Sequence, residues 1–201
     1  MKAHTLALVV AVSAALVVAA APRAAQAKVW TIDSSHSTVG FKVRHMMVSW
    51  VRGSFDKVEG TITYDPAKPA ATQAHVRIDV SSIDTGSDKR DAHLQEGDFF
   101  DVANHPAITF ESKAVKNVTK TGLDLVGDLT LRGVTREVTL KVTDLAGPMK
   151  SPWGSTSVGA SATAVISREE FGLKWNKVLD AGGLLIGKDV HLALDVEAKA
   201  K

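Results

Sequence analysis

Apolar and polar residues alternate along most of the chain after residue 27. From Ser37 to His45, the alternate positions include the apolar Val39, Phe41 and Val43, and polar residues or glycine occupy the positions between them. This period of two predicts β-strands with one buried face. A short opening strand is predicted at 29–32, and the eight main predicted strands are 37–45, 58–64, 74–80, 108–110, 123–131, 138–142, 158–166 and 190–196.

Turn residues separate the predicted strands. Arg132-Gly133 joins two of them closely enough to predict a hairpin. Strands that follow one another through short turns predict an all-β, eight-stranded antiparallel barrel. The proline dipeptides that fall between the strands are Asp65-Pro66, Lys68-Pro69, His105-Pro106, Gly147-Pro148 and Ser151-Pro152.

Two stretches break the alternation. Residues 87–103 mix charged residues with Leu94, Phe99 and Phe100, which predicts one or two short helices over an end of the barrel. Residues 167–187 contain four glycines and predict a long irregular loop. Loops of this length often take part in binding.

Small inward residues predict a hollow interior. An eight-stranded barrel is either filled by side chains or holds one small ligand. Along the 158–166 strand, three consecutive inward positions carry only methyl groups, at Ala160, Ala162 and Ala164. We therefore expect a lipophilic cavity that suits an extended alkyl or isoprenoid chain.

A filled core is the alternative. Gly60 and Gly127 also fall on inward positions, but Phe41, Phe110 or a tryptophan could occupy the space beside these small residues.

Polar residues near the barrel ends are candidates for contacting a head group. His45 ends an inward series, and Arg90 and His93 lie in the predicted end-covering segment. Alternatively, His45 is a satisfied rim residue and Arg90 pairs with Asp91 or another acid. The residues expected to contact a ligand are Phe41, Val43, His45, Arg90, His93, Phe99, Phe110, Leu129, Leu131, Ala160, Ala162, Ala164 and Phe171.

Residues 1–27 have the features of a cleavable signal peptide. Lys2 precedes an apolar run, and Ala25-Gln26-Ala27 provides a cleavage site. Removal of the leader gives a domain of residues 28–201 with 22 basic and 22 acidic side chains, since the leader holds two of the 24 basic residues. This balance argues against nucleic acid as a partner. A soluble, exported protein without cysteine or disulfides is expected.

Motifs for catalysis and metal binding are weak. Asp33, Ser35 and His36 are too close in sequence for a triad, whose members come from separate elements. A metal site would need His36, His45, His93 and His105 to meet at one end of the barrel, although they lack a known ligand spacing. We expect no enzymatic activity and no cofactor. The alternatives are a metal-binding protein and a module that docks onto a membrane redox enzyme.

Several motifs, in order, resemble the YceI-like family over residues 28–201. They are Asp33-Ser34-Ser35-His36-Ser37, Phe41-Lys42-Val43-Arg44-His45, Gly53-Ser54-Phe55, Thr85-Gly86, Arg90-Asp91-Ala92-His93-Leu94, Asp98-Phe99-Phe100-Asp101, His105-Pro106, Thr109-Phe110, 127–135 and Arg168-Glu169-Glu170-Phe171-Gly172.

This resemblance implies a periplasmic, lipocalin-like extended barrel that binds a polyisoprenoid or a prenylated quinone-like lipid without catalysis. It also implies a homodimer, as in relatives. A carrier of this kind would contact the inner membrane transiently. Residues 46–52 are bulkier than the family pattern, so ligand choice is expected to differ from that of relatives if this segment flanks the mouth.

Overall fold

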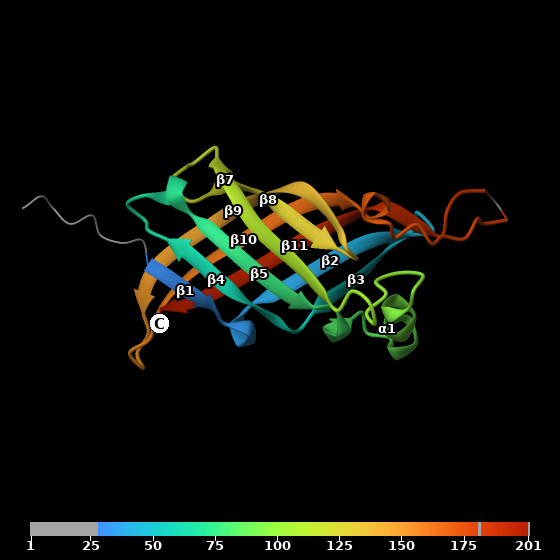
Figure 1. Ribbon diagram of the computed structural model, residues 1–201, viewed down its shortest axis with the longest axis horizontal. Coiled ribbons are helices and arrows are strands. Elements are labelled where there is room, and N and C mark those ends of the chain that lie inside the picture. The colour runs from blue at the N-terminus through green and yellow to red at the C-terminus, as the bar shows by residue number, and fades with distance from the viewer. Residues whose placement is uncertain (1–27, 181, 201) are drawn as a thin grey trace, which may run out of the picture.

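Strands make up most of the computed structural model of this protein, which describes residues 28–180 and 182–200 (Figure 1). The predicted leader at 1–27 lies outside the described residues. The strands are β1 (Lys28–Ile32), β2 (Thr38–His45), β3 (Ser49–Phe55), β4 (Val58–Tyr64), β5 (Gln73–Asp79), β6 (Ile83–Asp84), β7 (Ala107–Lys116), β8 (Leu123–Leu131), β9 (Val134–Lys150), β10 (Thr156–Ser167) and β11 (Ile186–Ala200). The helical elements are α1 (Asp88–Gln95) and four 3-10 turns, η1 (Ser34–His36), η2 (Pro69–Ala71), η3 (Val80–Ser82) and η4 (Arg168–Phe171).

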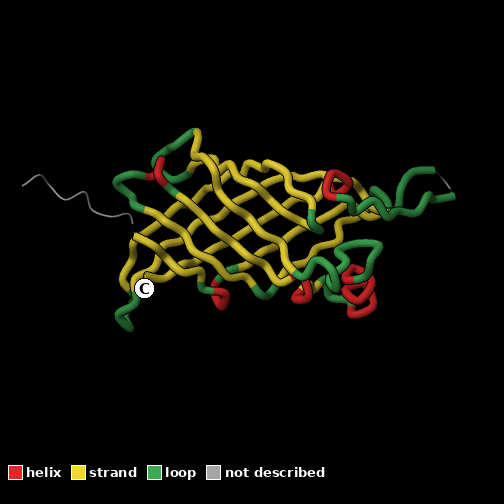
Figure 2. The backbone as a smooth tube through the Cα atoms, viewed as in Figure 1, coloured by secondary structure: helices red, strands yellow, loops and turns green. Residues whose placement is uncertain are grey.

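The strands form one antiparallel sheet that closes on itself. β11 pairs with β10 along one edge and with both β2 and β1 along the other. The eleven strands occupy eight positions around the ring, because three positions are each shared by two consecutive strands. β1 and β2 share one position, β3 and β4 share the second, and β5 and β6 share the third. The predicted eight-stranded antiparallel barrel is therefore confirmed, and Figure 2 shows its front and back strands crossing.

Turns and strand limits differ in part from the prediction. The Arg132-Gly133 hairpin is confirmed, with Leu131 paired to Val134. The Gly147-Pro148 dipeptide, however, lies inside β9 rather than between strands. Proline is tolerated there because the β9–β10 register is irregular at this point and β8 pairs with β9 only as far as Val142.

β3 is a strand that the alternation pattern does not predict. One of its inward positions is Gly53, and its outer face carries the large apolar side chain of Trp50. Both features weaken the period of two. The strand forms because it continues the β4 path and pairs with β2 from Val39–Phe55 to His45–Ser49.

The sheet splits at one end of the barrel. β5 pairs with β7 as far as Asp79 and Ala107, after which the chain turns away through η3, and β6 pairs with β3 instead. The segment with α1 lies at this split end, as predicted for residues 87–103 (Figure 1). Among the described residues, no helix is long and apolar enough to cross a bilayer.

The opposite end is filled by side chains. Trp30, Tyr64, Val158 and Ala198 form a buried cluster there, with Trp30 only 1% exposed. The indole Nε1 of Trp30 donates a hydrogen bond of 3.0 Å to the backbone oxygen of Tyr64. This cluster closes the end of the barrel where β1 pairs with the last residues of β11.

The β2–β3 turn has an unusual backbone. Met46 and Met47 have φ values of 50° and 62°, and the Val48 amide donates to the His45 oxygen. A left-handed conformation costs a residue with a Cβ about 1–2 kcal/mol. Asn-Gly is the pair that such a turn favours, so turn geometry does not explain the two methionines.

Replacing Trp30 tests the packing of the filled end. We expect Trp30→Ala to lower the free energy of unfolding by about 3–5 kcal/mol, because it creates a cavity and leaves the Tyr64 oxygen unpaired. Trp153→Ala is the matched control, since Trp153 is 92% exposed and should change stability by less than about 0.5 kcal/mol. Urea denaturation measures both, and equal effects would contradict the assigned packing.

Candidate functional site

A cavity of about 460 Å³ lies inside the barrel and extends to the α1 end. Its walls are inward side chains of β2, β3, β5, β7 to β11, together with α1 and the loop after η4. Most of the lining is aliphatic or aromatic. The volume lies within the range of small-molecule pockets, about 300–1,000 Å³.

The structure places nine of the predicted contact residues on the cavity wall. They are Phe41, Val43, His45, Arg90, His93, Phe99, Phe110, Leu129 and Leu131. These residues come from β2, α1 and its following loop, β7 and β8, which are far apart in sequence. The closed ring brings them around one space.

The other four predicted residues do not line this cavity. Ala160 borders a shallow outer groove, Ala162 is buried on β10, Ala164 packs beside the main core, and Phe171 is a core residue that is only 1% exposed. The three alanines expected to create the hollow are therefore not among its lining residues, although Ala162 and Ala164 pair with Leu194 and Leu192, which do line it. Val158, on the same strand, belongs to the cluster that fills the opposite end.

Phenylalanine rings also cover two small positions. A Cβ atom on Gly127 would lie 2.6 Å from Cζ of Phe110, and one on Gly53 would lie 2.5 Å from Cζ of Phe41. The rings thus occupy the space that these glycines leave. At these two glycines, the alternative that side chains fill the interior is therefore correct. The rest of the interior still contains the cavity.

Several lining residues are missing from the predicted set. Val138, Leu140 and Leu192 share the inward parity of predicted strands, so the alternation pattern could have identified them. Val51 and Phe55 lie on the unpredicted β3. Arg168 and Trp175 lie in an irregular segment without periodicity, and no sequence signal places them at the cavity.

Cationic and neutral polar groups contribute the polar part of the lining. They are Arg44, His45, Thr85, Arg90, His93 and Arg168. No aspartate or glutamate occurs among the lining residues in the described part of the chain. The cavity therefore combines an apolar interior with polar groups that can donate hydrogen bonds to an acceptor-bearing or anionic group.

Arg90 is held by a threonine rather than by an acid. Its Nε donates to Oγ1 of Thr85 at 2.6 Å, and its Nη2 donates to the Thr85 backbone oxygen at 2.7 Å. Asp91 instead accepts hydrogen bonds from the backbone amide and hydroxyl of Thr85. No carboxylate in residues 28–180 or 182–200 forms an ion pair with Arg90, so the expected alternative of an Asp91 pair does not occur.

His93 belongs to an aromatic group between α1 and the loop after η4. Its ring meets Phe99 and Trp175 edge-on at centroid distances of 5.1 and 5.2 Å, and those two rings lie 5.2 Å apart. Nε2 of His93 lies 3.2 Å from a carboxylate oxygen of Asp98. These contacts fix α1 against the loop, so the covered end of the cavity has a defined shape.

Arg168 is a buried cation whose donors bind backbone oxygens. Its Nε donates to Gly187 at 2.9 Å, and its Nη1 donates to Leu173 and to Trp175. Burial lowers the pKa of this guanidinium, and the Glu169 carboxylate at 4.0 Å opposes the shift. The side chain stays charged at neutral pH because arginine titrates far above it. It therefore holds the loop and adds positive charge beside the cavity.

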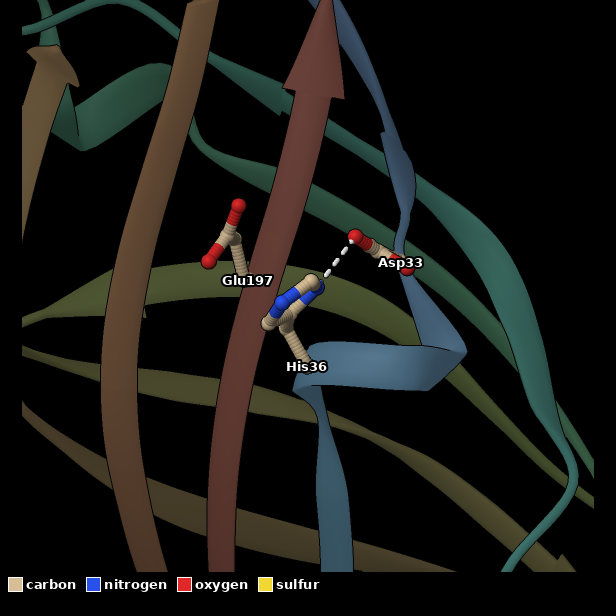
Figure 3. A group of neighbouring side chains, drawn as sticks. All are labelled: Asp33, His36 and Glu197. Atoms are coloured by element: carbon tan, nitrogen blue, oxygen red, sulfur yellow. Dashed lines mark hydrogen bonds and ion pairs between the residues drawn. The ribbon is translucent and has the colours of Figure 1, made fainter. Parts of the chain in front are cut away.

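A second group of polar side chains lies where β1 meets β2 and the end of β11. Asp33, His36 and Glu197 have potential metal-ligand atoms within 4.8 Å of one another (Figure 3). Asp33 also forms an ion pair with Lys199, and this contact, with hydrogen bonds from Ser35 and His36, holds the pKa of Asp33 far below its usual range. A metal ion would have to displace the lysine.

This group does not form a catalytic triad. Ser35 Oγ and Asp33 Oδ2 both contact Nδ1 of His36, at 3.0 and 2.8 Å. A triad requires the nucleophile and the acid to contact opposite ring nitrogens.

The four histidines of the metal hypothesis are not brought together. His45 and His93 line the cavity, but His36 lies in the group at the β1–β2 junction. His105 instead lies beside the Gly133 turn, where a Cβ atom on that glycine would come within 2.9 Å of the imidazole. The site therefore presents an apolar cavity with a cationic mouth rather than a histidine cluster.

Comparison with known proteins gives a family. Residues 30–198 match the YceI-like domain. A UPF0312 protein of Staphylococcus aureus (strain bovine RF122 / ET3-1) is 40% identical over 169 residues, which cover 84% of this chain and 95% of the relative.

Solved structures show the same architecture. BcnA of Burkholderia cenocepacia gives a TM-score of 0.73 at 25% identity, covering 83% of this chain and 99% of that chain. A YceI protein of Campylobacter jejuni gives 0.64 at 29% identity, covering 84% and 96%. A polyisoprenoid binding domain from Saccharophagus degradans gives 0.62 at 17% identity, covering 88% and 99%, which is a likeness of fold alone. Because the domain match spans nearly all of the described barrel, this chain belongs to the YceI-like family.

Proposed function

We propose that this protein carries an isoprenoid or related amphiphilic lipid, with the apolar chain inside the barrel and the head group at the α1 end. It binds the lipid without catalysing a reaction on it. The observation that carries this proposal is the 460 Å³ cavity, whose wall is apolar and whose polar groups are cationic or neutral. The solved domain from Saccharophagus degradans, described as polyisoprenoid binding, has the same fold and supports this class of ligand.

Burial of the apolar chain supplies the binding energy in this proposal. Each buried methylene contributes about 0.8 kcal/mol, so ten such groups contribute about 8 kcal/mol. Ordering the ligand opposes part of this gain. All the residues of β7, β8 and β9 that line the cavity are apolar. The length of the ligand's apolar chain, rather than polar contacts along it, would therefore determine the affinity.

The polar end supports a head group with hydrogen-bond acceptors. Arg90 has five N–H donors, and Thr85 accepts two hydrogen bonds from its guanidinium. The remaining donors, with His45 nearby in the lining, suit a phosphate or a quinone carbonyl. Arg168 adds positive charge but uses its donors on the loop.

The periplasm is the proposed location. This part of the proposal rests on the sequence of residues 1–27, where a basic residue, an apolar run and a small-residue cleavage site follow in order. A carrier would shield an apolar chain from water in such an aqueous compartment.

Filling the cavity should prevent loading. Val76 lines the cavity and is only half-buried, so the ring of Val76→Trp should enter the hollow and abolish lipid binding at little cost in stability. In a packed core the same change would cost about 1–3 kcal/mol. The lipid is measured by mass spectrometry of an organic-solvent extract of the purified protein.

Val165→Trp provides the matched control for this experiment. Val165 lies on β10, is 58% exposed and does not line the cavity, so this variant should keep its lipid. If Val76→Trp copurifies with the same amount of lipid as the control, the barrel interior is not the binding site.

The head-group assignment predicts a change in ligand preference. Arg90→Gln should reduce the preference for a prenyl phosphate over the corresponding free prenol by about tenfold, because a charge-assisted hydrogen bond is lost. Competition between the two ligands for purified protein measures this ratio. Arg77→Gln, on the exposed outer face of β5, should leave it unchanged, because Arg77 alternates with the lining residues Val76 and Ile78 and does not line the cavity. An unchanged ratio in Arg90→Gln would contradict the head-group assignment.

A further inference from the structure

Two neighbouring segments at the α1 end expose large apolar side chains. They are the β2–β3 turn and the loop between η4 and β11, which projects beyond the barrel (Figure 1). We call their exposed residues the apolar tip, and its members are Met46, Met47, Val48, Val178 and Leu184. Met47, Val48 and Val178 are 64%, 78% and 72% exposed. The segments touch, since the Met46 amide donates to the Leu185 oxygen at 2.8 Å.

The apolar tip does not stabilise the barrel. Its side chains lie outside the buried core and do not line the cavity, unlike His45, Leu185 and Ile186 beside them. Met46 and Met47 also have positive φ values, where other residues would be less strained. Strained backbone and exposed apolar side chains at one place point to a role outside folding.

Basic residues flank the tip residues along the chain. We call Lys42, Arg44, Arg52, Lys174, Lys177 and Lys188 the basic collar. The segments 42–52 and 174–191 contain these six cations and two acids, Asp180 and Asp189, whereas residues 28–201 as a whole are balanced. None of the collar residues forms an ion pair with a carboxylate of the described chain.

Trp50 lies between the tip and part of the collar. The guanidinium of Arg44 and the ammonium of Lys42 lie 4.3 and 4.9 Å from the centre of its ring. Tryptophan is enriched at membrane interfaces, where its ring contacts both apolar and polar groups. Apolar side chains surrounded by basic residues are typical of surfaces that bind anionic lipid.

The tip also lies at the end where the cavity is lined by polar groups. Arg44 and His45 of β2 line the cavity directly before the tip residue Met46, and Leu185 lines it directly after Leu184. The other end of the barrel is filled by the Trp30 cluster. A surface that seats the tip would therefore face the mouth of the cavity.

We propose that the apolar tip inserts among the head groups of an anionic lipid bilayer, with the basic collar on the lipid phosphates and the cavity mouth toward the membrane. This inference rests on the proposed function, because it gives the carried lipid a direct path between bilayer and barrel. The partner is the bilayer itself, recognised through apolar contact and negative charge.

Vesicle binding tests the tip. The Met46→Asn and Met47→Gly double variant removes two apolar side chains and supplies residues that the turn favours, so it should fold at least as well as the parent. Binding to sonicated vesicles of equimolar phosphatidylglycerol and phosphatidylcholine, followed by flotation, should fall about tenfold. Met149→Asn with Trp153→Asn is the control, because these exposed apolar residues lie at the β9–β10 connection, next to Val158 of the Trp30 cluster, and it should bind like the parent.

Charge is tested separately. Arg52→Gln with Lys188→Gln removes two collar residues that do not line the cavity, and should weaken binding to the same vesicles about tenfold. Binding of the parent should also fall as salt rises and should be weaker on pure phosphatidylcholine vesicles.

Loading from detergent micelles separates this inference from the proposed function. The three double variants of the vesicle tests should take up a prenol from micelles as the parent does. A parent that loads from micelles but does not bind anionic vesicles would overturn the docking inference alone. The same conclusion would follow if the Met149 and Trp153 variant lost as much vesicle binding as the Met46 and Met47 variant. A parent that takes up no prenol from micelles would contradict the proposed function, whatever its vesicle binding.

Discussion

Closure of the ring along β11 is the constraint on which the other features depend. This strand of 15 residues pairs with β10 on one side and with β2 and β1 on the other. Closure satisfies the backbone of what would otherwise be exposed edges. It also fixes which side chains face inward on every strand, because a shift of one residue would turn the apolar face outward. The enclosed apolar space exists only because this last strand returns to the first.

The two ends of the same ring have different structures. At one end, the Trp30 cluster packs side chains from β1, β4, β10 and β11 into a solid plug. At the other end, β5 pairs with β7 but β6, which follows β5, pairs only with β3. The sheet is therefore open there, and α1 with the loop after η4 covers the gap. A covering loop packs less completely than facing strands do, so the cavity lies toward this end. The polar residues that line the cavity therefore lie toward the end covered by α1 and this loop.

Arginines hold the covering segments mainly through hydrogen bonds to backbone oxygens. Arg168 binds the oxygens of Leu173, Trp175 and Gly187, and Arg132 binds those of Gly97 and Gly172. Carbonyl groups carry no formal charge, so these contacts do not neutralise the guanidinium charges, and Glu169, 4.0 Å from Arg168, offsets one of them in part. With Arg90 held by Thr85, the same interactions that order the loops also favour an anionic or acceptor-bearing head group. Structural stability and ligand preference thus have a common physical source.

The sequence by itself determined the fold class and much of the cavity wall. A period of two is a local property, so residues such as Phe41, Phe110 and Leu129 could be assigned inward from their own strands. The pattern did not predict β3, because Gly53 and Trp50 weaken the alternation of apolar and polar residues in this strand. The tertiary structure decided which part of the interior is empty. The Trp30 cluster joins residues up to 168 positions apart, from Trp30 to Ala198, and Phe110 covers Gly127 from a neighbouring strand. Parity shows which way a side chain points, but only the packing of distant strands determines whether another side chain fills the space beside it.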